Sequence, residues 1–186
     1  MNALSATPSR PRCFHAQFFR GTSGAIVLAK TDECHLQLVA LFFLRRVKKK
    51  YIALVHSKDE MLEQEGTIDS NIDGKHAISR YRVMKVHEDA GKPFAVQLEV
   101  ETLTGRQHQV RKHCAHGLGR PIILDPLYGH PGSQQFSDRI SKLEKELNGM
   151  REMFFLHASH ISIPEFEISA KAPLPSSWHE TLEQQE

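Results

Sequence analysis

Apolar and polar residues alternate most clearly over residues 94–101, where the apolar positions are Phe94, Val96, Leu98 and Val100. This alternation is typical of a β-strand with one buried face. Four further apolar segments predict strands: residues 25–29, 47–55, 81–87 and 154–163. Pro164 interrupts the last of these strands. Residues 165–169 are expected to continue or to pair with that last strand.

Helical spacing appears first after Thr31 and Asp32, either of which can cap a helix. The apolar residues at positions i, i+3, i+4 and i+7 of this helix are Leu36, Val39, Ala40 and Phe43. Three more helices are predicted over residues 107–116, over residues 137–147 and around Trp178. The polar segment 58–75 reads as a surface excursion, and residues 1–13 as unstructured.

Strands outnumber helices in this pattern, and few strands are joined by a helix. The sequence therefore predicts an α+β fold with a mixed, mainly antiparallel sheet and flanking helices. A length of 186 residues suits one domain, and 40% hydrophobic with 25% charged residues suits a folded globular chain. No apolar run reaches the roughly 20 residues of a membrane-spanning helix, so no membrane partner is expected.

Three widely spaced cysteines without a CxxC pair argue against a disulfide framework and point to a reducing compartment, the cytoplasm. The first 31 residues contain no acid and several Arg, Ser and Thr. That composition is shared by organelle transit peptides and by plain disordered tails, so an organellar location stays open.

Charge is distributed unevenly along the chain. Residues 1–58 hold ten Lys and Arg against two Asp and Glu, although the whole chain has a net charge of only +2. A basic half suggests an anionic partner, and a solvated surface is the alternative explanation.

The segment Leu103–Arg111 combines two guanidinium groups with an imidazole and amides. Arg106 and Arg111 suit phosphate or carboxylate, whereas His108 and Gln109 suit a base edge or a sugar hydroxyl. No acid occurs between Glu101 and Asp125, so the local potential is positive. A basic surface helix remains the simpler alternative.

The same region is rich in potential zinc ligands: His108, His113, Cys114 and His116. Tetrahedral zinc sites draw paired ligands from separate elements. These four residues lie on one predicted helix with no second cluster nearby, so no metal is expected, and RNA contact or plain surface is favoured.

The segment Leu103–Arg111 resembles the T-G-R-x-H-Q-[IVL]-R motif of RluA-like RNA pseudouridine synthases. Further segments resemble that family's motifs in the same order: residues 21–30, 47–55, 119–129, 156–158 and 172–175. The resemblance covers residues 20–178 and implies an incomplete catalytic domain of the pseudouridine synthase type. Residues 1–19 match nothing in the family, whose opening strands are missing, and residues 179–186 are expected to form a tail.

The resemblance implies an isomerase that converts uridine to pseudouridine in structured RNA, such as rRNA or tRNA, without a metal or cofactor. It assigns catalytic roles to Tyr51 and Arg111, which should face a common cleft. The RNA-binding residues that it implies are Thr22, Ser23, Gly24, Lys49, Arg106, His108 and Gln109. A monomer is expected.

One departure from the family is serious. The family reads R-L-D-x-x-T-S-G, and the position of its essential aspartate is held here by Phe19, after Gln17 and Phe18. Asp32 lies past the predicted strand 25–29 and cannot substitute without rearrangement. A truncated or misassembled gene product, a non-catalytic paralogue and a local misalignment are the competing explanations, of which the first is favoured. A catalytically inactive RNA-binding protein is therefore the alternative function, and Arg111 is expected to lack its carboxylate partner.

Overall fold

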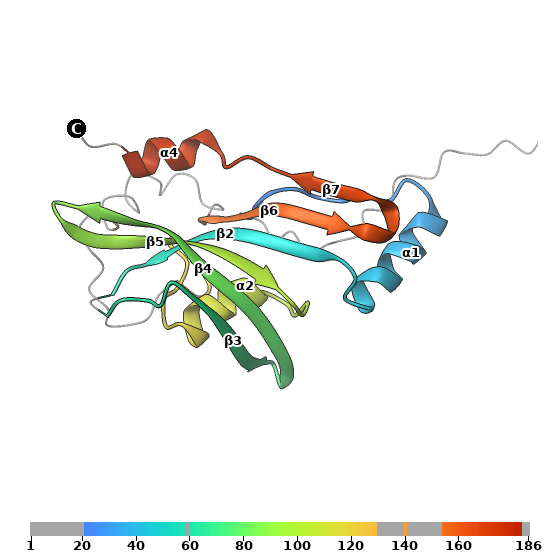
Figure 1. The fold of residues 1–186 in the computed structure, drawn as a ribbon, viewed down its shortest axis with the longest axis horizontal. Helices are drawn as coiled ribbons and strands as arrows, with labels where there is room; N and C mark the ends of the chain where they lie inside the picture. Colours follow the sequence, from blue (N-terminus) through green and yellow to red (C-terminus); the bar gives the residue numbers. More distant parts are fainter. Residues whose placement is uncertain (1–20, 59, 130–139, 141–153, 184–186) are drawn as a thin grey trace, which may run out of the picture.

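The computed structural model describes residues 21–58, 60–129, 140 and 154–183. Within them lies one seven-stranded sheet with the order β1-β6-β2-β5-β4-β3, and β7 pairs with β6 (Figure 1). Every pairing is antiparallel except that of β1 with β6. The strands are β1 (Ser23–Gly24), β2 (Lys48–His56), β3 (Glu65–Ile72), β4 (Lys75–Asp89), β5 (Lys92–Thr102), β6 (Leu156–Ile163) and β7 (Ile168–Lys171). The predicted α+β class is confirmed.

Strand β3 was not predicted, because residues 58–75 appeared to be a surface excursion. This prediction is wrong: β3 pairs with β4 through a two-residue turn in which Asp73 and Gly74 both have positive φ, of 50° and 73°. The strand lies at the edge of the sheet, and only Ile68 and Ile72 are buried on it. Its other residues are mostly polar and exposed, so the sequence of β3 lacks the alternation of apolar and polar residues by which a strand is predicted.

Helix α1 (Asp32–Phe43) forms where it was predicted, and the Oγ1 atom of its N-cap Thr31 accepts a hydrogen bond from the Cys34 backbone at 3.1 Å. Its buried side differs from the prediction. Leu38 is buried, and the small core beneath it contains Ala29, Val47, Ile161 and Ile163. The four residues of the predicted face are all exposed: Leu36, Val39, Ala40 and Phe43. Apolar residues surround most of this helix, so helical spacing fits more than one face.

The predicted strand over residues 25–29 is also wrong, since only Ser23 and Gly24 pair with β6. Gly24 lies so close to β6 that an added Cβ would stand 2.2 Å from the carbonyl oxygen of Ala158. Beyond the hydrogen bond from the Ala25 backbone to Ala158, residues 26–30 leave the sheet. Ala29 is nevertheless buried, so tertiary packing explains part of this apolar run.

The predicted helix over residues 107–116 is present as α2 (Gln109–Lys112), continued by the π-helix η1 (His113–Gly117). The predicted terminal helix is α4 (Ser176–Glu183), and Trp178 packs edge-on against Phe155 with ring centres 5.0 Å apart. The short 3₁₀ helix η2 (Pro164–Phe166) joins β6 to β7. The helix predicted over residues 137–147 falls outside the described residues, apart from Ile140.

Helices α2 and α4 lie on opposite sides of the sheet, and α1 lies at one end beside the β6–β7 hairpin (Figure 1). The main core contains Leu54, Leu98 and Val100. None of the described helices is long and apolar enough to cross a membrane.

The sheet face that points away from α2 carries charges of both signs. The Oε1 atom of Glu99 accepts hydrogen bonds from Lys50 at 3.0 Å and from Arg82 at 3.3 Å. Arg80 stands opposite Glu101 in the register of β4 and β5. Lys50 and Arg82 on this face are therefore paired with an acid of the strand between them, β5.

Candidate functional site

A cavity of about 410 Å³ lies between α1, β2, β6 and the segment that leads into α2. Its lining contains no Asp or Glu among the described residues, whereas four of its side chains are Lys or Arg: Arg45, Lys49, Arg106 and Arg111. His108 and His160 also line it. The cavity is therefore positively charged and suited to an anionic ligand.

Tyr51 and Lys49 reach the cavity because they are two residues apart on β2 and so share one face of the strand. Burial raises the pKa of the Tyr51 phenol to about 12, so the hydroxyl stays protonated at neutral pH. Burial also lowers the pKa of Lys49, whose ammonium nitrogen lies 5.7 Å from the centre of the Phe42 ring.

Arg111 lines the same cavity as Tyr51 and is only 3% exposed. Its Nε and Nη2 atoms donate to the two carboxylate oxygens of Asp125 at 2.7 and 2.5 Å. The guanidinium also stacks on Phe154 and Tyr128, 4.4 and 5.0 Å from the ring centres. The expectation that Arg111 would lack a carboxylate partner is therefore wrong. Ile122 forms a bridge with Val55, and the loop that follows it brings Asp125 to Arg111.

The Asp125 carboxylate is fully committed within the protein. Besides Arg111, its Oδ1 atom accepts the backbone N–H groups of Leu127 at 2.9 Å and Tyr128 at 3.1 Å. The side chain has no exposed surface. Asp125 therefore holds a turn and an arginine, and it does not offer an oxygen to a ligand in the cavity.

Gln109 occupies the centre of a buried hydrogen-bond network. Its Oε1 atom accepts from Thr104 Oγ1 at 2.7 Å and from the Arg106 backbone at 2.9 Å. Its Nε2 atom donates to the Ile78 carbonyl at 2.8 Å and to Ser79 Oγ at 3.0 Å. Direct contact between Gln109 and RNA, as predicted, would require one of these bonds to break.

Arg106 borders the cavity and is tied to the tip of the β3–β4 hairpin. Its Nε atom donates to the His76 carbonyl at 2.9 Å, and no described carboxylate pairs with it. Nearby, the Lys112 ammonium contacts both carboxylate oxygens of Asp73, at 2.7 and 2.6 Å. The hairpin therefore fixes the position of the motif's first arginine.

His108 precedes α2 in a left-handed conformation with φ of 56°, and its Nδ1 atom lies 2.8 Å from the Tyr128 hydroxyl. Its pKa is lowered, first by burial and then by the positive charges of Arg111 and Lys112. The ring is therefore mainly neutral at pH 7. The described residues contain no group of three or more potential ligands arranged to hold a metal ion.

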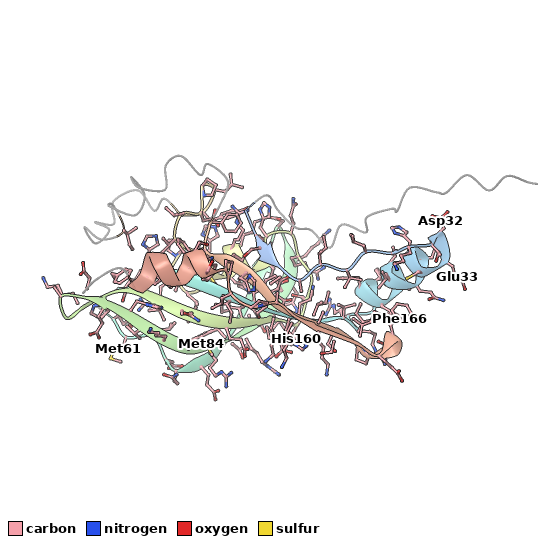
Figure 2. The ribbon with its side chains drawn as sticks, turned by 90° about the horizontal axis from the view of Figure 1, so that it is seen from above. Asp32, Glu33, Met61, Met84, His160 and Phe166 are labelled. Carbon is pink, nitrogen blue, oxygen red and sulfur yellow. The ribbon has the colours of Figure 1, made fainter. Side chains whose placement is uncertain are left out.

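The segment before α1 contributes less to the cavity than predicted. Thr22 lines it, but Ser23 Oγ hydrogen-bonds His157 Nδ1 at 2.9 Å, and Gly24 packs on β6. Phe19 lies outside the described residues. Asp32 is exposed in the first turn of α1 and is not a lining residue; it lies toward the outer end of the molecule, away from His160 (Figure 2).

Sequence reasoning missed three residues that organise this site: Thr104, Asp125 as an ion-pair partner, and Tyr128. Thr104 and Tyr128 lie within segments that resemble family motifs, which was an available signal. The pairing of Asp125 with Arg111 had no local signal, because it depends on how the loop returns to α2.

Comparison with known proteins gives a consistent result. The family model described as RNA pseudouridylate synthase matches residues 19–116. An uncharacterized RNA pseudouridine synthase of Zymomonas mobilis is 32% identical over 178 residues, which cover 86% of this chain and 71% of the relative. The ribosomal large subunit pseudouridine synthase D of Pseudomonas aeruginosa is 36% identical over 122 residues, covering 59% of this chain and 36% of the relative.

Solved structures agree in fold. Human RNA Pseudouridylate Synthase Domain Containing 1 superimposes with a TM-score of 0.63 at 26% identity, covering 83% of this chain and 66% of that one. Among the sequence relatives, an uncharacterized RNA pseudouridine synthase of Chlorobaculum parvum is 31% identical over 205 residues, which span 59% of that relative's length. The family model matches residues 19–116, and the Zymomonas relative is 32% identical with 71% of its length covered. The chain therefore belongs to the RNA pseudouridylate synthase family.

Proposed function

We propose that this protein serves RNA pseudouridylation and that its cavity receives a uridine extruded from structured RNA, such as rRNA or tRNA. The observation that carries the proposal is the presence of Tyr51 and Arg111 in one positively charged cavity whose described lining lacks acids. Extruding a base costs a few kcal/mol. Stacking on an aromatic ring returns about 1–3 kcal/mol, and phosphate contacts add to it.

The family's reaction is an isomerisation. The bond between the ribose carbon C1′ and N1 of the base breaks, the base turns, and C1′ bonds to C5. The proton on C5 leaves and N1 gains one, so atoms balance without a co-reactant. Tyr51, a neutral phenol because its pKa is about 12, can stack on the base but is a weak proton acceptor at neutral pH.

Isomerisation in this family also depends on an aspartate. Phe19 holds that position in this chain, and the nearby Asp125 is committed to Arg111. RNA binding without isomerisation is therefore the second candidate function. The observation that supports this second candidate is that the described lining of the cavity contains no carboxylate.

Two measurements test the proposal on the same preparation. Anisotropy with a labelled RNA hairpin whose loop contains uridines should show binding that weakens as salt rises, because phosphate contacts release counterions. Equal affinity at low and high salt would contradict the RNA-binding proposal. Incubation with total RNA carrying tritium at C5 of uridine separates the two candidates: release of tritium supports isomerisation, and no release above background supports RNA binding without isomerisation.

Tritium release that disappears on Tyr51→Phe or Arg111→Ala would reject the non-catalytic candidate. It would show that another residue had assumed the role of the aspartate. Release that survives both substitutions would indicate a contaminating enzyme, which a mock purification from cells lacking the chain would identify.

A further inference from the structure

Phe43, the last residue of α1, is 85% exposed and yet lines the cavity. It does not belong to the core beneath α1, to which Phe42 contributes instead. Val39, one turn earlier, also lines the cavity and is 39% exposed. An aromatic side chain therefore stands in solvent at the edge of a positively charged cavity.

Arg45 lies two residues later and has an uncommon backbone conformation. Its φ of 58° is left-handed, which glycine adopts more readily at the end of a helix. The turn is fixed by backbone hydrogen bonds from Arg45 to the Phe42 carbonyl at 3.2 Å and from Arg46 to the Leu41 carbonyl at 2.9 Å. An arginine is thus held where a glycine, which has no Cβ atom, would be less strained.

The two adjacent arginines differ in their partners. Arg46 pairs with Glu165 at 2.7 Å, whereas no described carboxylate pairs with Arg45, which lines the cavity. A cation beside an exposed aromatic ring matches the two parts of a nucleotide, because the ring can stack on the base and the guanidinium can bind the phosphate.

We propose that Phe43 and Arg45 form a second nucleotide subsite, which binds the nucleotide next to the extruded uridine. This inference rests on the proposed function and extends it to a second base. The charge of the cavity selects an RNA strand over an apolar protein segment, since Lys49 and Arg106 lie on the same cavity and no described acid does. Because every base has a stacking face, the subsite should tolerate different bases at this position.

The test uses the full chain and an RNA hairpin with a uridine followed by 2-aminopurine in its loop. Stacking quenches the fluorescence of 2-aminopurine. Phe43→Ala should weaken binding by about tenfold and abolish the quenching, whereas Phe43→Tyr should retain both. Arg45→Gln should weaken binding and lower the slope of affinity against salt by about one counterion. Leu36→Ala is the matched control, since Leu36 is 69% exposed on the same helix but does not line the cavity.

Wild-type affinity and quenching in Phe43→Ala would overturn the subsite while leaving the proposed function intact. Absence of binding by the wild-type chain would overturn both. Equal weakening by Leu36→Ala and Phe43→Ala, with a lower Tm in each, would show that protein covers this helix face and would also overturn the subsite.

Discussion

Arg111 and Asp125 form a buried, two-point ion pair, with nitrogen–oxygen distances of 2.7 and 2.5 Å. Arg111 is therefore anchored by Asp125, which lies fourteen residues later in the chain. Its orientation at the cavity is a property of the loop that carries Asp125. A ligand that reaches Arg111 meets a guanidinium whose charge is already balanced.

Removal of the acid should destabilise the fold. Asp125→Ala leaves the Arg111 charge buried and two backbone N–H groups without their acceptor, so the free energy of unfolding should fall by about 3–5 kcal/mol. Urea unfolding followed by circular dichroism measures this. Asp69→Ala, which removes an exposed pair with His76, should change it by no more than about 0.5 kcal/mol. Equal effects would contradict the structural role of Asp125.

Arg106 should matter for RNA affinity. Arg106→Ala removes a cation from the cavity, so binding of the hairpin RNA should weaken, and the slope of affinity against salt should fall by about one. Titrations at several salt concentrations measure both quantities. Arg82→Ala removes the same charge from the opposite sheet face and should have the smaller effect on affinity. A larger loss of affinity in Arg82→Ala than in Arg106→Ala would place the RNA on the sheet face that points away from the cavity, which contradicts the prediction.

Substitution of the two glutamines beside His108 should have different effects on thermal stability. Gln109→Ala removes four hydrogen bonds in a buried network, and each buried group left unpaired costs about 1–3 kcal/mol. Gln107 is exposed, so Gln107→Ala should leave Tm nearly unchanged. Thermal unfolding compares the two variants. A stable Gln109→Ala protein with weakened RNA binding would restore the predicted RNA contact of Gln109.

Stability should fall as the pH is lowered below about 6.5, the ordinary pKa of histidine. Burial lowers the pKa of His113, whose Nδ1 atom lies 2.9 Å from Ser79 Oγ. The unfolded chain therefore binds more protons than the folded one in this range, and the stabilisation present above pH 6.5 is lost as the pH falls. His113→Asn should reduce the difference in Tm between pH 7.5 and 5.5. An unchanged difference would assign the effect to another group, such as His108.

Much of the fold could be predicted from periodicity, because the central strands bury one face and show it. Strand β5 is the clearest case: Phe94, Val96, Leu98 and Val100 are all buried as the alternation requires. Edge strand β3 escaped prediction because it buries only two isoleucines. The position of helix α1 was predicted from its cap and spacing, but its orientation was not, because apolar residues lie on more than one side of its second half and do not reveal which side meets the sheet.

The candidate site was predictable only in part. Family resemblance selected Tyr51 and Arg111, and both line one cavity. The resemblance could not indicate that Gln109 is committed to Ile78 and Ser79, or that Asp125 reaches Arg111, since these contacts join segments far apart in the sequence. The catalytic roles of Tyr51 and Arg111 and the RNA-binding role of Gln109 stay predictions.

The sheet face that points away from α2 and the cavity differ in how their positive charges are paired. Glu99 offsets Lys50 and Arg82 there, while Arg45, Lys49 and Arg106 at the cavity have no described acid beside them. Among the described residues, the cations that lack an acid beside them therefore include three at the cavity. We expect these cations to steer a polyanion toward the cavity, an effect that raises association rates by about 10- to 1000-fold at low ionic strength.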